Sequence, residues 1–114
     1  MKKITAATVI LLFALSSCTT TTLYSWSNYD STSYNYLKNR DDKSVEELVK
    51  TYERIIAGQK GTRKVVPPGI YADYGFILVQ SGKIEEGIKM MKMEVSLYPE
   101  SAQFVSNIIK IYEK

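Results

Sequence analysis

Apolar side chains recur with helical spacing through most of this chain of 114 residues. Between Ser44 and Gly58 they follow the i, i+3, i+4, i+7 pattern, which gathers them along one stripe of a helix. The members of this stripe are Val45, Leu48, Val49, Tyr52, Ile55 and Ile56. Because no segment shows the strict alternation that is typical of a β-strand, the pattern predicts an all-α fold.

Glycine and proline residues divide the pattern into four to five short helices, which we expect to form antiparallel hairpins. Ser44 and Glu47 have the spacing of a capping box at the start of the long stripe, and Gly58 marks its end. The loop 58–69 that follows is rich in glycine, proline and basic residues. Further helices are predicted over residues 30–38, 70–81, 84–98 and 101–112, with breaks at Gly82 and Pro99.

The composition excludes several kinds of catalytic site. The chain has no histidine and one cysteine, so it lacks the residues for Ser-His-Asp or Cys-His catalysis, for a His-containing zinc site and for an intramolecular disulfide. Its carboxylate pairs are Asp41-Asp42, Glu46-Glu47 and Glu85-Glu86. Adjacent residues on a helix point about 100° apart and do not converge on a substrate. We therefore expect a protein without enzyme activity, cofactor or metal.

The N-terminal residues 1–17 have the order of a bacterial lipoprotein signal peptide. Lys2 and Lys3 precede an uncharged, mostly apolar run that ends at Leu15, well short of the about 20 residues of a membrane span. The run leads into Leu15-Ser16-Ser17-Cys18, which resembles the lipobox where signal peptidase cuts before a lipidated cysteine. The resemblance predicts cleavage before Cys18 and lipid attachment to its thiol.

The predicted cleavage also changes the charge of the chain. Loss of Lys2 and Lys3 lowers the formal net charge from +3 to +1, so no basic balance remains that would favour nucleic acid. Thr19 follows the cysteine, where the inner-membrane retention signal of many diderm bacteria has Asp. We therefore expect lipid anchoring at the periplasmic face of the outer membrane.

The predicted tether, residues 18–28, joins the lipid to a helical domain over residues 29–114. It contains aromatic residues, among them Tyr24 and Trp26, and Tyr29 follows directly. These rings could pack the N-terminal segment onto the helices, or could bind a partner or lipid headgroups. The basic residues Lys60, Arg63 and Lys64 of the loop likewise fit a solvated loop or contact with anionic lipid.

Residues 71–99 resemble one tetratricopeptide repeat in their spacing. The positions that carry the resemblance are Tyr71, Tyr74, Gly75, Leu78, Gly82, Gly87, Met91 and Pro99. Gly75 and Gly87 would let the paired helices approach closely, and Gly82 would make the turn between them. Gly87, Met91 and Glu94 depart from the residues that are usual in the repeat.

One such repeat cannot bury its own face, so we expect helix 44–57 to stack before it and helix 101–112 after it. In tetratricopeptide proteins the first helix of a repeat lines the ligand groove. The resemblance therefore implies a groove formed by Ala72, Phe76, Val79 and Gln80. Phe76 and Val79 would be covered by helix 44–57 if they were core residues, and would be open if they bound a partner.

The mature chain also resembles a family of small bacterial lipoproteins that contain a domain of unknown function with tetratricopeptide-like character. The residues that carry this resemblance are Tyr24-Ser25-Trp26-Ser27-Asn28-Tyr29, Tyr36-Leu37-Lys38, Val66-Pro67-Pro68-Gly69-Ile70-Tyr71-Ala72 and Tyr98-Pro99-Glu100-Ser101. The family usually has Gly where Ser27 stands. Its members are commonly encoded beside a lipoprotein that resembles the curli secretion channel, which implies a shared envelope assembly.

Together these features predict a non-catalytic, lipid-anchored adaptor or accessory subunit that binds a protein partner in the cell envelope, with the curli-channel-like lipoprotein as a candidate partner. The alternative is a module that binds lipid or another hydrophobic molecule through Met90, Met91 and Met93. Such methionines more often fill gaps in a core. The oligomeric state does not follow from the sequence.

Overall fold

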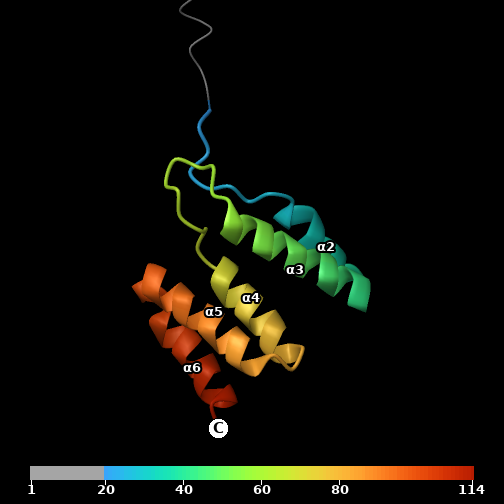
Figure 1. Ribbon diagram of the computed structural model, residues 1–114, viewed down its shortest axis with the longest axis vertical. Helices are drawn as coiled ribbons and strands as arrows, with labels where there is room; N and C mark the ends of the chain where they lie inside the picture. Colours follow the sequence, from blue (N-terminus) through green and yellow to red (C-terminus); the bar gives the residue numbers. More distant parts are fainter. Residues whose placement is uncertain (1–19) are drawn as a thin grey trace, which may run out of the picture.

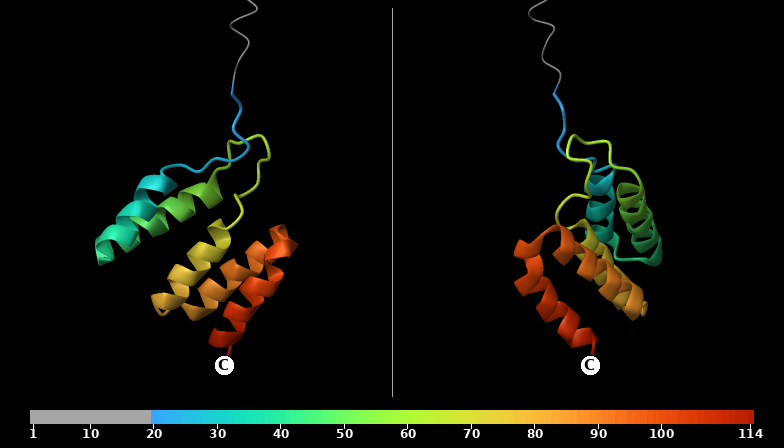
Figure 2. Two further views of the ribbon diagram at one scale, coloured as in Figure 1. Left: turned by 180° about the vertical axis from the view of Figure 1, so that it is seen from behind. Right: turned by 60° about the vertical axis from the view of Figure 1, so that its left-hand side comes forward.

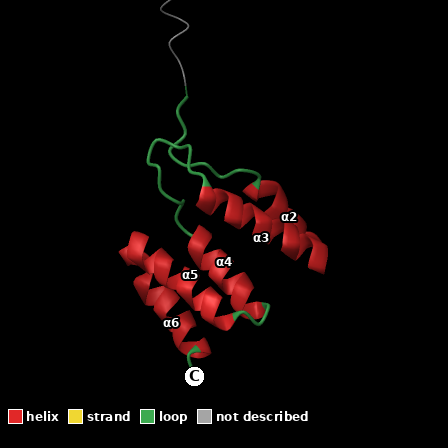
Figure 3. Cartoon of the chain, in the orientation of Figure 1, coloured by secondary structure: helices red, strands yellow, loops and turns green. Residues whose placement is uncertain are grey.

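The computed structural model describes residues 20–114, which fold into five α-helices and one short 3₁₀-helix without a strand. The predicted signal peptide and Cys18 lie outside the described residues. The helices are α2 (Tyr29–Asn39), α3 (Asp42–Ala57), α4 (Ile70–Gln80), α5 (Ile84–Leu97) and α6 (Ala102–Tyr112), and the 3₁₀-helix η1 is Pro99–Ser101. The predicted all-α fold is confirmed (Figures 1 and 3).

The helices are arranged as two hairpins and a closing helix. α2 packs on α3, α4 packs on α5, and α3 contacts α4 where the two hairpins meet. α6 packs on the far side of α5, as the turned views also show (Figure 2). Helix α3 therefore stacks before the α4–α5 pair and α6 after it, as the repeat spacing predicts.

The start of α3 differs from the predicted capping box. Asp41, not Ser44, is the N-cap residue: its carboxylate accepts the backbone N–H of Ser44 at 2.8 Å, and its own N–H donates to the Ser44 hydroxyl at 3.1 Å. The prediction that paired Ser44 with Glu47 was therefore wrong by three residues. A carboxylate cap also interacts favourably with the helix dipole, and Arg40 ends α2 in a left-handed conformation just before it.

Two clusters of buried side chains form the core, and α4 contributes to both. The first core cluster lies between α3 and α4 and contains Leu48, Tyr52, Ile55, Val66, Ile70, Tyr71 and Ile77. The second core cluster joins α4, α5 and α6 and contains Val79, Met91, Val105 and Ile109. Burial on two sides accounts for the nearly continuous apolar sequence of α4.

The contact between α4 and α5 is made by backbone at two glycines. A Cβ atom on Gly75 would lie 2.6 Å from the carbonyl oxygen of Gly87, and one on Gly87 would lie 2.5 Å from the carbonyl oxygen of Gly75. Both distances are far below van der Waals contact, so each position requires glycine. Gly82 makes the turn with a φ of 86°. The predicted close approach and turn are therefore confirmed.

The surroundings of Glu94 account for its departure from the repeat pattern. It is buried on α5, with 2% of its surface exposed, and its Oε1 atom accepts the backbone N–H of Gly69 at 2.7 Å. A carboxylate at this position satisfies a free donor at the start of α4. Tyr98 donates to the carbonyl oxygen of Val66 at 2.7 Å. Together the two side chains hold residues 66–69 against α5.

The N-terminal segment is part of the folded structure from Thr22 onward. The backbone N–H of Thr62 donates to the carbonyl oxygen of Thr22, and that of Arg63 donates to the carbonyl oxygen of Leu23, each at 3.1 Å. The side-chain amide of Gln59 donates to the Ser25 carbonyl at 2.9 Å and accepts the Ser25 N–H at 3.1 Å. The folded unit thus begins before residue 29, the predicted domain boundary.

Candidate functional site

A row of aromatic rings connects the N-terminal segment to α3 and α4. The ring centroids of Tyr24 and Trp26 are 6.3 Å apart, those of Trp26 and Tyr29 are 5.9 Å apart, and those of Tyr29 and Tyr52 are 5.9 Å apart. Tyr52 then stacks on Tyr74 at 5.5 Å. These distances are typical of favourable aromatic pairs. The segment rings thus pack onto the helices, while Trp26 keeps 40% of its surface exposed.

An open pocket of about 190 Å³ lies between α2, α3 and α4, where this ring row passes. Its wall is mostly aromatic and aliphatic, with one carboxylate. The lining residues are Tyr29, Ser33, Tyr36, Leu37, Leu48, Tyr52, Asp73, Phe76 and Ile77. Aromatic rings therefore separate the two hairpins at this contact, and the pocket between them has room for a further chemical group.

Asp73 supplies the carboxylate of the pocket. Its Oδ2 atom accepts a hydrogen bond from the Tyr29 hydroxyl at 3.0 Å. Burial among the rings raises the pKa of Asp73, and the Tyr29 hydrogen bond opposes that rise. Although the residue as a whole remains exposed at the rim, its carboxylate is partly removed from water. Burial, followed by the charge of Asp73, raises the pKa of Tyr29 to about 12.

Tyr52 forms the floor beside Asp73 and is 3% exposed. Burial, and then the Asp73 charge, raise the pKa of its phenol far above the ordinary value. Tyr74 lies behind it and donates to Glu53 at 3.1 Å. Burial, and then that hydrogen bond, raise the pKa of Tyr74 to about 12. Tyr29, Tyr52 and Tyr74 are therefore neutral over the physiological range.

The four α4 residues that the repeat resemblance assigned to one groove lie in different places. Phe76 lines the pocket and is 39% exposed. Val79 is 5% exposed within the second core cluster, Ala72 packs against that cluster, and Gln80 is exposed. The assignment of Val79 to an open groove does not hold because α5 and α6 cover that side of α4.

Asp73 was not among the residues that the sequence singled out. It is the single charged residue of α4, an isolated carboxylate in an otherwise apolar or neutral helix. It also lies three positions before Phe76, a spacing that puts the two side chains on the same face of a helix. These two signals would have identified the pocket carboxylate.

The methionines of the alternative lipid-binding interpretation do not gather at one site. Met91 is a member of the second core cluster and is 1% exposed. Met90 packs against the first core cluster, and Met93 is 39% exposed. The three side chains therefore point to different surroundings, two of which belong to the core.

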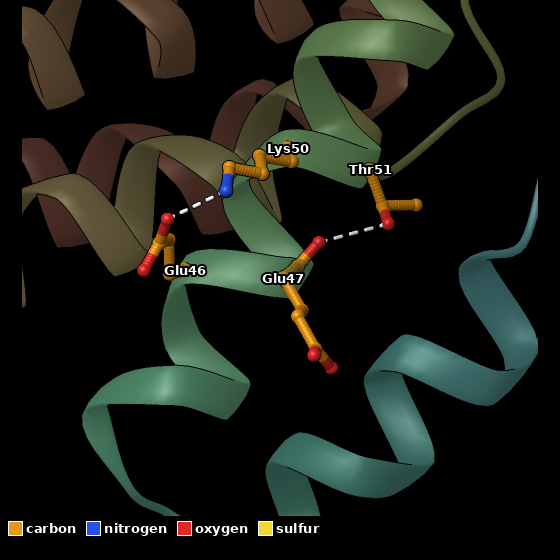
Figure 4. Close-up of polar contacts among 4 residues, drawn as sticks. All are labelled: Glu46, Glu47, Lys50 and Thr51. Carbon is orange, nitrogen blue, oxygen red and sulfur yellow. Dashed lines mark hydrogen bonds and ion pairs between the residues drawn. The ribbon is translucent and has the colours of Figure 1, made fainter.

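Two of the paired carboxylates near α3, those of Asp41 and Glu46, make structural contacts. Asp41 caps the helix, and Glu46 forms an ion pair with Lys50 on the exposed surface (Figure 4). Thr51 donates to the backbone carbonyl of Glu47 at 3.0 Å (Figure 4). Within residues 20–114, no group of three or more acidic or cysteine side chains is arranged to hold a metal ion. Nor is any helix of that part long and apolar enough to span a membrane.

The fold and pocket define a small all-helical domain with two packed hairpins and one ring-lined site. Residues 23–108 match the family described as Domain of unknown function (DUF4810), and the chain therefore belongs to that family. The match begins at Leu23, within the N-terminal segment that is hydrogen-bonded to the loop 58–69. No curated protein and no solved structure gives a significant match to the chain.

Proposed function

We propose that this chain is a non-catalytic, lipid-anchored adaptor of the bacterial envelope that binds a protein partner in the pocket between α2, α3 and α4. The observation that carries the proposal is the pocket itself, which is open to solvent and has the half-exposed ring of Phe76 at its edge. Concave, mostly apolar sites with a few polar groups are the usual form of a binding site.

The size of the pocket favours a protein partner over a whole small molecule. Its volume of about 190 Å³ is below the roughly 300–1,000 Å³ of typical small-molecule and cofactor sites. One side chain of a docked partner would fill it. Binding of lipid or another hydrophobe is the alternative function, and it has less support because the three methionines are not gathered at one site.

The docked N-terminal segment supports a defined orientation on the membrane. If Cys18 carries the lipid, residues 18–21 alone connect it to Thr22, which would then lie within roughly 13 Å at about 3.3 Å per extended residue. The loop 58–69 lies beside this segment at one end of the domain (Figure 1). Its exposed Lys60, Arg63 and Lys64 would face the headgroups, where each basic residue contributes about 1 kcal/mol at an anionic surface.

We further propose that the anchor holds the protein at the periplasmic face of the outer membrane. Tethering to one membrane raises the effective concentration of other anchored lipoproteins. The curli-channel-like lipoprotein implied by the family resemblance is a partner of this kind. A site that recognises a neighbour by shape, without a catalytic group, fits an accessory subunit of such an assembly.

Photo-crosslinking of the full-length lipidated protein in native membranes tests the proposal. A probe at Phe76 should give one discrete protein adduct, identified by mass spectrometry, and Cys18→Ala should abolish it. Phe104 on α6 is the matched control, because it is a 71% exposed phenylalanine outside the pocket. Equal adducts at both positions would contradict the proposal, and lipid adducts alone at Phe76 would favour the hydrophobe-binding alternative.

A further inference from the structure

We propose that the pocket between α2, α3 and α4 receives a basic side chain of the partner protein, lysine or arginine, with Asp73 as its counter-ion. The inference rests on the proposed function, since it takes the pocket to be the docking site. It adds the chemistry of the group that docks there.

Asp73 lacks an opposite charge within the part of the chain that the structure describes. The ion pairs there are Glu46–Lys50 and Lys92–Glu113, and the pocket lining contains no lysine or arginine. The hydrogen bond from Tyr29 satisfies part of the carboxylate but does not neutralise it. Because burial disfavours the ionised form of Asp73, a cation beside it would be bound more tightly than at a solvated carboxylate.

The rings around the carboxylate are suited to a cation. Tyr29, Tyr36, Tyr52 and Phe76 all line the same pocket, and aromatic faces attract ammonium and guanidinium groups within about 6 Å. Tyr29 and Tyr52 also stay neutral at physiological pH, since burial raises the pKa of each. A carboxylate within an aromatic wall is therefore a site for a positively charged group.

The apolar part of the wall fits the stem of such a side chain. Leu48 and Ile77 are 2% and 6% exposed and line the same pocket, where the methylenes of lysine or arginine can pack. An acidic side chain would be repelled by Asp73. A purely apolar side chain would bury the carboxylate further without pairing it, which carries a desolvation cost.

The binding of two small probes to the full-length protein in detergent micelles tests the inference. Butylammonium carries the charge and the apolar stem of lysine, and 1-butanol is a neutral molecule of similar size. Trp26 reports on the site by fluorescence, because its ring lies 5.9 Å from that of Tyr29, which lines the pocket. We expect butylammonium to bind at least tenfold more tightly than butanol.

Two variants separate the pocket charge from the general surface charge. Asp73→Asn should remove the preference for butylammonium, whereas Asp30→Asn should retain it, because Asp30 is an exposed carboxylate of α2 that does not line the pocket. Circular dichroism would verify that both variants remain helical. Equal binding of the two probes, binding of neither, or a preference that survives Asp73→Asn would overturn the inference.

The outcome is distinguishable from failure of the proposed function. A protein adduct at Phe76 without a preference for butylammonium would retain the adaptor and remove the basic side chain as its ligand. A preference for butylammonium without a protein adduct at Phe76 would retain the cation site and contradict the adaptor.

Discussion

Helix α4 packs mainly against two helices, α5 and α3, and the two contacts are of opposite kinds. Against α5 it approaches through bare backbone, with Gly75 and Gly87 so close that neither has space for a Cβ atom. Against α3 it packs through tyrosine rings, with Tyr52 stacked on Tyr74, and beside this contact Tyr29 of α2 donates a hydrogen bond to Asp73. The first contact leaves no space, and the second leaves the pocket.

The difference separates the structural contact of α4 from the contact that holds the proposed binding site. Close backbone contact gives many dispersion contacts and tolerates no added volume. The contact through large aromatic rings, beside the single carboxylate of Asp73, leaves a pocket that a partner could enter. We therefore infer that the α4–α5 contact contributes to stability alone, whereas the α3–α4 contact holds the first core cluster and also leaves a pocket that is available for binding.

The largest expected effect comes from adding one methyl group to the close contact. In Gly87→Ala the new Cβ atom would lie 2.5 Å from both the Gly75 carbonyl oxygen and the Val79 side chain. We expect a loss of about 3 kcal/mol in the free energy of unfolding, at the upper end for overpacking. Urea denaturation followed by circular dichroism would measure it.

Gly58→Ala is the matched control, because the nearest atom to its Cβ would be the Arg54 carbonyl oxygen at 4.0 Å. Its free energy of unfolding should change by less than about 0.5 kcal/mol, as at other surface sites. Similar losses in the two variants would show that the close contact is not special.

The next effect concerns the buried carboxylate that joins α5 to the start of α4. Glu94→Ala would leave the Gly69 N–H without its acceptor and should lower the free energy of unfolding by about 2 kcal/mol. Glu94→Gln keeps an acceptor for this group and should cost about half as much, because a neutral hydrogen bond replaces a charge-assisted one. Equal stabilities of all three proteins would contradict this role.

The ring-spaced contact should be sensitive to high pH. Folding raises the pKa values of Tyr29 and Tyr74 from 10.0 to about 12, chiefly through burial. A group with a raised folded-state pKa stabilises the fold fully below its unfolded pKa, and that contribution is lost as the pH rises through the folded value. Stability should therefore fall between about pH 10 and pH 12.

Tyrosinate absorbance, recorded for the native protein and for the protein in urea, would measure this ionisation. We expect part of the tyrosine signal of the native protein to titrate above the range seen in urea. Coincident titration curves in the two conditions would mean that the rings are not protected by the fold.

The smallest effect on stability is expected at the edge of the pocket. Phe76→Ala should lower the free energy of unfolding by only about 1 kcal/mol, because its side chain is already 39% exposed. Phe104→Ala, at 71% exposure, should lower it by less than about 0.5 kcal/mol. A loss in Phe76→Ala as large as that in Gly87→Ala would place Phe76 in the core and remove the distinction between the two contacts.

The helices and the close contact could be predicted from the sequence because both depend on local spacing. The apolar period of α3 and the breaks at Gly82 and Pro99 determine element boundaries within a few positions. Gly75 and Gly87 sit at the positions where paired helices approach. The capping box was misplaced because Ser44-x-x-Glu47 fits the usual S/T-x-x-E/Q pattern, whereas the observed box pairs an Asp41 cap with the Ser44 hydroxyl, which that pattern does not include.

The candidate site was predicted only in part because it depends on which neighbour each helix face meets. Phe76 lines the pocket, but Val79 faces the second core cluster, and periodicity gives no means of telling these faces apart. The hydrogen bonds between Gln59 and Ser25 span 34 positions, so the docking of the N-terminal segment was not visible in local patterns. Ser27, where the family usually has Gly, has a φ of 51° in this docked segment.

Amide hydrogen exchange of the full-length protein tests the central claim most directly. α4 buries six residues, among them Gly75 and Leu78, whereas Thr32 is the buried residue of α2. Regions with few buried contacts open locally at lower free energy than the global transition. We predict that amides of α4 and α5 exchange only through global unfolding and that those of α2 exchange faster. Equal protection in α2 and α5, or faster exchange in α5, would contradict the division between a stabilising and a binding contact.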